Sequence, residues 1–164
     1  MLKFEESCAI SGQLCFFVRK NGQIIEEYRE NNAIMTLGRV AVARLFAGLP
    51  DGNGKFVGVG DSGEPPNPEQ TGLSAQYLVE ASKISFVNAQ VENGITSWMA
   101  SDTSTPNVRF DFTFGPQDAN GLEIREFGLF CEDGTMFARR VRSSGKAIQK
   151  DDDLTIEGYW IVLF

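Results

Sequence analysis

The sequence contains no histidine. Imidazole is the commonest general base, a frequent metal ligand and the base of most hydrolytic triads, so its absence removes most routes to an enzyme. The carboxylates offer no replacement, because Glu123 and Glu126 are three positions apart and would point to opposite faces of a strand. We therefore do not expect an enzyme, and we expect neither a cofactor nor a small-molecule substrate.

Cysteine is scarce, and long apolar runs are missing. The three cysteines, Cys8, Cys15 and Cys131, form no CxxC pair, so reduced and partly buried thiols are expected. The acidic neighbours of Cys131 would raise its thiol pKa, which disfavours a nucleophile. No segment has the roughly 18 consecutive apolar residues of a membrane span. Residues 1–8 include acids and lack the apolar stretch of a secretory signal, so we expect the protein to stay where it is made.

Positive charge is in short supply. The formal net charge is −7 and the pI is near 4.6, which disfavours a nucleic-acid or anionic-membrane partner. Arg139, Arg140 and Arg142, with Lys146 and Lys150, form a local exception. They fit either a solvated strand edge with its loop or a docking patch for an acidic partner.

Two motifs for small ligands are incomplete. Residues 58–63 fit the GxGxxG string, but Pro65 and Pro66 stand where a helix would have to receive a phosphate, so a tight glycine turn is expected. The run 151–153 consists of three aspartates without the alternating spacing of a calcium loop, so we expect a charged turn. No metal or cofactor site is predicted.

Apolar residues are abundant. Hydrophobic residues make up 42% of the 164 positions, including 13 phenylalanines, which indicates one packed domain over 1–164. Three pairs of apolar-rich runs flank turn dipeptides that accept positive φ angles: 13–20 with 23–29, 83–92 with 95–99, and the two halves of 122–141. The turn dipeptides Asn21-Gly22, Asn93-Gly94 and Asp133-Gly134 predict three β-hairpins, and Asp133-Gly134 suits a type I′ turn.

One helix is expected over 33–47, with Asn31 and Asn32 as capping candidates and Gly48 near its end. Its apolar surface is wider than one stripe, so we expect the sheet on one side of the helix and something else on the other. Gly38 inside the helix indicates close approach of another backbone or a tolerated flaw.

The remaining strands complete the predicted fold class. Residues 108–114 alternate apolar and polar side chains, as in a strand with one buried face. Residues 154–164 are apolar on both faces near their end, so this strand is either central in a sheet or covered by another subunit. The class expected is α+β, mainly β: an antiparallel, sandwich-like sheet packed with one main helix.

The sequence motifs "IREFGLF", "DGTMFARR" and "VGVGDSGEPP" resemble those of the tail-collar fibre module near the N-terminus of tail fibres in contractile-tailed bacteriophages. The resemblance covers about 33–164, and the hairpin within 1–30 precedes it. Gly128 interrupts the strand's alternation, as a bulge would. Arg125 and Glu126 are expected to bond to a neighbouring strand or loop. The residues that match the family's motifs are Gly60, Asp61, Gly63, Ile124, Arg125, Glu126, Gly128, Leu129, Phe130, Asp133, Gly134 and Thr135.

The resemblance implies a structural virion protein at a collar, neck or baseplate, or at the attachment of a tail fibre. No fibre shaft or receptor-binding tip follows the module, so we expect the attachment part alone, made in the host cytoplasm and built into the particle. Its partners would be copies of itself, in a ring or trimer, and other tail, neck or baseplate proteins. The candidate contact residues are Phe16, Phe17, Pro65, Pro66, Arg139, Arg140, Arg142, Trp160 and Phe164.

A carbohydrate-binding β-sandwich is the alternative. Trp98, Tyr77, Tyr159 and Trp160 are possible sugar platforms. This alternative predicts that the rings are exposed and aligned on one face.

Overall fold

The computed structural model describes residues 10–49, 52–101, 105–142 and 146–164. The predictions for Cys8 and for residues 1–8 lie outside the described residues. Within them, strands dominate and there is a single helix, α1 (Thr36–Phe46), so the fold class is as predicted. No helix in this part of the chain has the length and hydropathy needed to cross a membrane.

Antiparallel pairing organises the described strands into one large sheet and one small one. The large sheet has the order β4-β3-β9-β10-β2-β1-β12-β7-β5-β6, and β11 pairs with β8 separately. The bounds are β1 (Ser11–Lys20), β2 (Gln23–Ile34), β3 (Gly54–Gly60), β4 (Tyr77–Glu80), β5 (Lys83–Glu92), β6 (Ile95–Ala100), β7 (Asn107–Phe114), β8 (Glu123–Ile124), β9 (Glu126–Cys131), β10 (Met136–Val141), β11 (Ile148–Gln149) and β12 (Leu154–Leu163).

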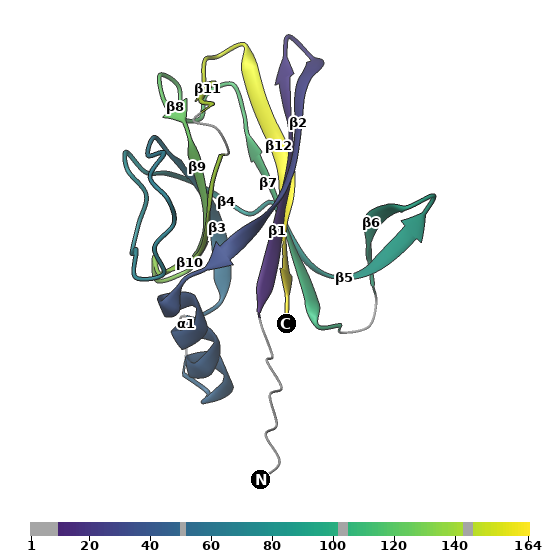
Figure 1. The fold of residues 1–164 in the computed structure, drawn as a ribbon, viewed down its shortest axis with the longest axis vertical. Helices are drawn as coiled ribbons and strands as arrows, with labels where there is room; N and C mark the ends of the chain where they lie inside the picture. The colour runs from purple at the N-terminus through teal and green to yellow at the C-terminus, as the bar shows by residue number, and fades with distance from the viewer. Residues whose placement is uncertain (1–9, 50–51, 102–104, 143–145) are drawn as a thin grey trace.

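The long strand β2 joins the two halves of the large sheet. Its first part pairs with β1, and its last residues, Ala33 and Ile34, pair with Arg139 and Ala138 of β10. Figure 1 shows the two halves leaning toward each other, with α1 at one end and the β5–β6 hairpin extending to the other side. The N-terminal hairpin is therefore built into the middle of the sheet.

The core lies between these halves. The Phe16 ring stacks on Phe127 of the opposite half and on Tyr28, with centroid distances of 4.7 Å in both cases. The terminal strand β12 pairs with β1 on one side and with β7 on the other. Of the two alternatives for its apolar faces, the central position is the observed one.

All three predicted hairpins are confirmed, since β1 pairs with β2, β5 with β6 and β9 with β10. Asn21 and Gly22 both have positive φ, as do Asn93 and Gly94, which is the type I′ pattern. The third turn differs from the prediction. Gly134 is its only positive-φ residue; its amide donates to the Cys131 carbonyl, and the Asp133 carboxylate accepts from the Thr135 amide. The register also shifts between Met136 and Ala138, so the turn is not type I′.

The helix is shorter than predicted. It begins at Thr36 after Met35, which makes no side-chain cap, while Asn31 and Asn32 lie in β2. The capping prediction was wrong because β2 continues to Ile34 to pair with β10. The helix end is as expected, since Gly48 follows it at a φ of +77°.

Gly38 marks a close backbone contact, as one of its two interpretations predicted. A Cβ atom on Gly38 would lie 3.0 Å from the Phe137 Cα and closer still to the Phe137 carbonyl oxygen. The Met35 amide also donates to that carbonyl at 2.9 Å. The absence of a side chain at Gly38 therefore lets α1 pack directly on β10.

Candidate functional site

The residues of the motif resemblance converge on a buried ion pair, Glu126 of β9 with Arg139 of β10. Both side chains are 1% exposed, and the Arg139 Nε donates to Glu126 Oε2 at 2.7 Å. The other carboxylate oxygen accepts from the amides of Ser62 at 3.2 Å and Ser74 at 2.8 Å. A buried carboxylate needs such partners because desolvation of a charge is costly.

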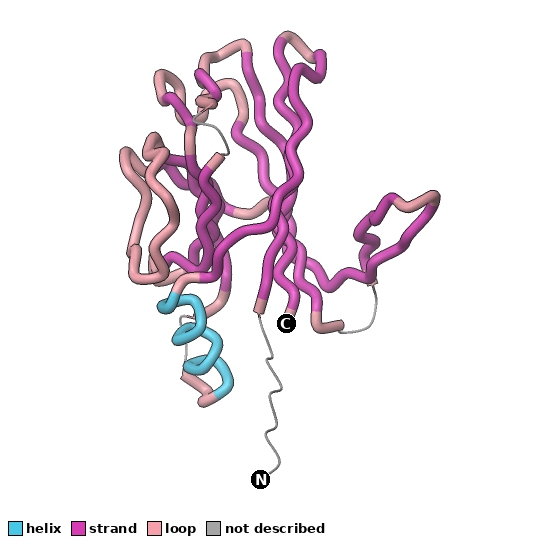
Figure 2. Tube along the Cα trace, viewed as in Figure 1, coloured by secondary structure: helices cyan, strands magenta, loops and turns pink. Residues whose placement is uncertain are grey.

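Arg139 completes this arrangement from the other side. Its terminal nitrogens donate to the Glu64 carbonyl at 3.2 Å and to Gln70 Oε1 at 3.0 Å. The ion pair thus holds both arms of the loop 61–76, which includes Pro65 and Pro66; loops are drawn in pink in Figure 2. We call the pair and its four loop contacts the clamp.

Two glycines leave room around the clamp. A Cβ on Gly60 would lie 2.6 Å from the Ser74 carbonyl oxygen and would collide with the Glu126 carboxylate. A Cβ on Gly128 would lie 2.6 Å from the Phe130 ring. Gly128 pairs in register with Gly58 and with Arg139, so the prediction of a bulge there was wrong. The position is glycine because the neighbouring ring fills the space.

The other motif residues support the same region or lie at its rim. The Asp61 amide donates to the Ser74 carbonyl at 3.0 Å, and the exposed Gly63 follows in the loop. Arg125 forms an ion pair with Glu123 at 2.9 Å, so Glu123 and Glu126 have separate partners. The side chains buried in the core are Ile124, Leu129 and Phe130, and the turn residues Asp133 and Gly134 are exposed.

The predicted basic docking patch is not a free surface. Arg139 belongs to the clamp, and Arg142 is buried against Glu26 and the Lys146 carbonyl. Arg140 donates to the Tyr28 hydroxyl and to the Asn31 carbonyl. Lys150 is also buried, donates to Asn120 Oδ1 at 2.9 Å, and has its pKa lowered by desolvation. Arg139, Arg142 and Lys150 therefore do not support the docking interpretation, because their buried side chains bind groups of the chain itself.

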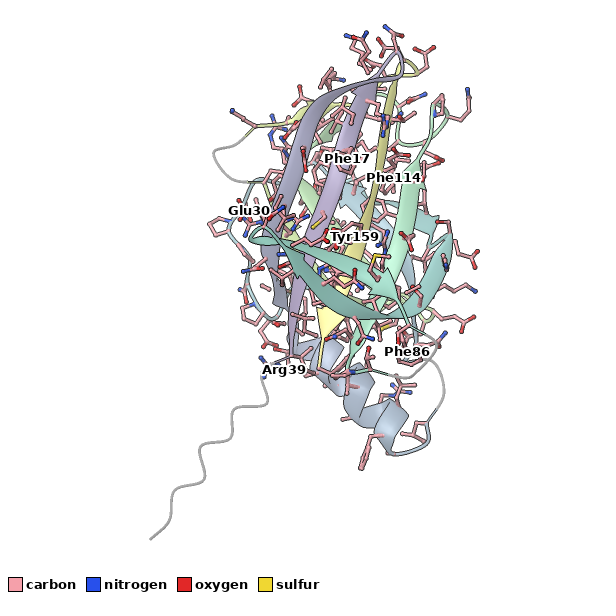
Figure 3. All side chains as sticks on the ribbon, turned by 90° about the vertical axis from the view of Figure 1, so that its right-hand side faces the viewer. Phe17, Glu30, Arg39, Phe86, Phe114 and Tyr159 are labelled. Atoms are coloured by element: carbon pink, nitrogen blue, oxygen red, sulfur yellow. The ribbon has the colours of Figure 1, made fainter. Side chains whose placement is uncertain are left out.

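Two aromatic contact candidates are internal as well. Phe16 and Trp160 face the core, with exposures of 1% and 0%, so neither offers a surface for a partner. The Trp160 indole donates to Asn32 Oδ1 at 2.8 Å, so the Asn32 side chain binds Trp160 and does not cap the helix. Phe17 lies half-buried on the opposite face of β1 (Figure 3). Phe164 remains 53% exposed.

The described cysteines are free and buried, as predicted. Burial raises the pKa of the Cys15 thiol, and it raises the pKa of Cys131 to about 11. Both side chains therefore remain neutral thiols at neutral pH. The described residues include no group of three or more His, Cys, Asp or Glu side chains that could hold a metal ion.

An apolar groove of about 430 Å³ opens at the end of the molecule that carries α1. Residues of α1 and of strands from both halves of the sheet line it, and none of its lining residues is charged. Its lining consists of Val42, Leu45, Gly52, Asn53, Gly54, Ile84, Phe86, Val108, Phe110, Leu129, Phe137, Val162 and Phe164. In Figure 3 the labelled Phe86 lies beside the helix end of the molecule.

Large apolar side chains around the groove are exposed. Phe46, which follows the groove residue Leu45 at the end of α1, is 95% exposed. The exposed large apolar side chains of the groove lining itself are Leu45, Ile84, Phe86 and Phe164. The sequence analysis identified only Phe164 among them. The wide apolar surface predicted for the helix was the available signal, since Val42 and Leu45 form one wall of the groove.

The aromatic rings proposed as sugar platforms do not form one exposed row. Trp160 is fully buried, and the Arg109 guanidinium lies 4.1 Å from the centroid of the Tyr159 ring. Tyr77 lies on β4, a different strand of the sheet, and its hydroxyl donates to Asp118 Oδ1 at 2.9 Å. The Trp98 carbonyl of β6 accepts from the Arg109 guanidinium of β7. This arrangement lacks the alignment that carbohydrate binding predicts.

The fold and its surfaces define a class, an antiparallel mainly-β scaffold with one helix, a polar clamp inside and an apolar groove outside. Comparisons with protein-family models, curated proteins and solved structures found no match to this chain.

Proposed function

We propose that this protein is a structural component of a tailed-bacteriophage particle, at the collar or neck, at the baseplate, or where a tail fibre attaches. It acts by assembly with copies of itself and with other tail proteins, and its place is the virion. The observation that carries the proposal is the groove, a cluster of exposed apolar side chains that the described residues leave uncovered.

Exposed apolar side chains occur singly on most soluble proteins, whereas a contiguous patch marks an interaction site. Here the exposed rings of Phe86 and Phe164 line one uncharged cavity, and the exposed Phe46 directly follows Leu45, another residue of the lining. Obligate subunit interfaces have this composition, since they resemble a domain core cut in half. The groove is therefore suited to a permanent contact in an assembly.

The clamp supports the same function. Gly60, Glu126 and Arg139 belong to the sequence motifs that resemble the collar-fibre module. Hydrogen bonds of Glu126 and Arg139 attach a proline-rich loop to the sheet, and Gly60 leaves room for the Glu126 carboxylate. Such an arrangement gives a rigid surface without a reactive group. A scaffold that binds its neighbours through shape requires that rigidity.

Protein composition of purified particles tests the proposal. Phage particles produced from the genome that encodes this chain are purified by density gradient and analysed by mass spectrometry and by immunogold electron microscopy. The expected result is stoichiometric recovery of the chain, with label on the tail or neck, and genes for tail proteins on either side of its own. Recovery only from the infected-cell lysate, with none in the particles, would contradict the proposal.

A further inference from the structure

We propose that the groove is filled by a second copy of this chain, with Phe46 of each copy inserted into the groove of the other in a closed, two-fold dimer. The inference rests on the proposed assembly function of the groove and names its partner. It starts from one observation: among the described residues, both an apolar projection and an apolar cavity remain uncovered.

The projection is Phe46. At 95% exposure it makes almost no contact within its own chain, although its ring is among the most costly side chains to leave in water. The cavity has about 430 Å³ and is lined by carbon-rich side chains with no charge. An aromatic ring is the kind of group that such a cavity accepts, and another copy of the chain provides it.

The exposed area is sufficient for a dimer. The side chains involved are Leu45, Phe46, Ile84, Phe86 and Phe164, whose exposed fractions are 46%, 95%, 49%, 44% and 53%. With about 150–250 Å² for a whole aromatic side chain, they present on the order of 600 Å² per chain, which is the lower end of what one partner contributes to a stable interface. One contact between copies covers both the projection and the cavity.

Charge favours the same partner. Each chain has a formal net charge of −7, so two copies repel each other at most surfaces. The groove is an exception, because none of its lining residues is charged. A strongly charged partner would find no ion pair there, whereas a second copy meets neither repulsion nor an unpaired charge.

The position of the projection decides the symmetry. Leu45 lines the groove and Phe46 is the next residue, so projection and cavity lie on the same end of the molecule. A head-to-tail ring joins two different surfaces, whereas a two-fold contact joins one surface to itself. Adjacent projection and cavity therefore favour a dimer over the ring or trimer that the sequence resemblance implies.

The first test is the mass of the purified full-length chain, measured by sedimentation equilibrium over a wide concentration range. We expect twice the 18.1 kDa of one chain. Phe46→Ser should raise the dissociation constant by about 100-fold or more, since two-fold symmetry removes a central ring twice. Val91→Ser is the matched control, because Val91 is 67% exposed on the β5–β6 hairpin and should leave the mass unchanged.

The second test locates the contact. A photoreactive benzoylphenylalanine at position 46 is introduced into a mixture of isotopically light and heavy chains. Light-to-heavy cross-links to residues 84–86 or 108–110 support the proposal. A single-chain mass at every concentration, a closed assembly of three or more, an unchanged mass for Phe46→Ser, or cross-links to other regions would each overturn it.

These outcomes are separate from the particle test. A chain found in purified particles but monomeric in solution would overturn the dimer and leave the virion function standing. A chain that is dimeric in solution but missing from the particles would overturn the virion function and leave the dimer standing.

Discussion

The clamp and the groove solve opposite problems in one fold, although both draw residues from β9 and β10. In the clamp, two charged side chains are buried, and every loop contact that compensates them comes from the same chain. In the groove, apolar side chains stay exposed although the fold brings them together. The difference shows which groups a chain must satisfy by itself and which it can leave for a partner to cover. An unpaired buried charge is prohibitive, whereas an exposed apolar ring is tolerable in water.

The helix α1 links these regions. Its Gly38 packs on the backbone of Phe137, close to Arg139 of the clamp, and its far end carries Leu45 of the groove lining, followed by Phe46. The clamp strand β10 therefore positions the groove wall. Changes to the clamp should act on the folding of the chain, and changes at the groove rim should act on association.

Breaking the clamp should have the largest effect. Arg139→Ala leaves the Glu126 carboxylate buried without its counter-charge, and we expect a loss of about 3–5 kcal/mol in the free energy of unfolding, as for other broken buried ion pairs. Urea denaturation followed by circular dichroism measures it. Arg125→Ala is the control: its ion pair with Glu123 is partly exposed, so about 0–1 kcal/mol is expected. A similar, small loss for both variants would show that the clamp does not hold the fold.

Separating the helix from the clamp strand should have the next largest effect. Gly38→Ala raises helix propensity by about 1 kcal/mol, but its Cβ would collide with the Phe137 carbonyl, a backbone group that cannot rotate away. We expect a net destabilisation of about 1–3 kcal/mol from this overpacking. Arg39→Ala, at an exposed position of the same helix turn, should change stability by less than about 0.5 kcal/mol. If Gly38→Ala stabilises the protein, the close packing of α1 on β10 is wrong.

Alkaline pH should weaken the folded state through the clamp strand. Burial raises the pKa of Cys131, at the end of β9, from 9.0 to about 11. The unfolded chain loses this proton first as the pH rises, so the stabilisation is complete below pH 9 and is lost between pH 9 and 11. The loss at pH 10 is about 1.4 kcal/mol relative to pH 8. Burial also raises the pKa of Tyr159, from 10.0 to about 12, which extends the decline above pH 10.

Urea denaturation at a series of pH values checks this prediction, and Cys131→Ala is the control. Whatever its stability at pH 8, that variant should show a flatter profile between pH 8 and 10, because the titrating thiol is gone. Parallel profiles for the two proteins would refute the assignment.

Local sequence signals predicted the parts of the fold that depend on local geometry. Asn21-Gly22 and Asn93-Gly94 form hairpins because both positions of each pair accept positive φ. The close contact at Gly38 was predictable because glycine inside a helix lowers helix stability, so its presence there indicates a packing requirement. The helix start was missed because pairing of Ile34 with β10 is a tertiary contact that overrides the cap signal of Asn31 and Asn32.

The clamp was within partial reach of the sequence. In the hairpin, Glu126 pairs with Val141, so Arg139 is its diagonal neighbour on the same face. The missing information was burial, because the amides of Ser62 and Ser74 come from a loop more than fifty residues earlier in the chain. The groove was out of reach for a related reason. Its lining comes from α1, β3, β5, β7, β9, β10 and β12, which only the tertiary fold brings together.

The smallest effect on folding is expected at the groove rim. Phe46→Ser removes an aromatic ring that is 95% exposed, so the free energy of unfolding should change by less than about 0.5 kcal/mol. Phe137→Ser is the matched control, because Phe137 also lines the groove but is only 7% exposed, and its loss should cost about 3–5 kcal/mol. Both variants are denatured at concentrations low enough for the chain to be monomeric, since association adds apparent stability. A large loss for Phe46→Ser under these conditions would mean that the ring supports the fold. Phe46 could then no longer be treated as a residue that acts on association alone, and the contrast between the clamp and the groove would fail.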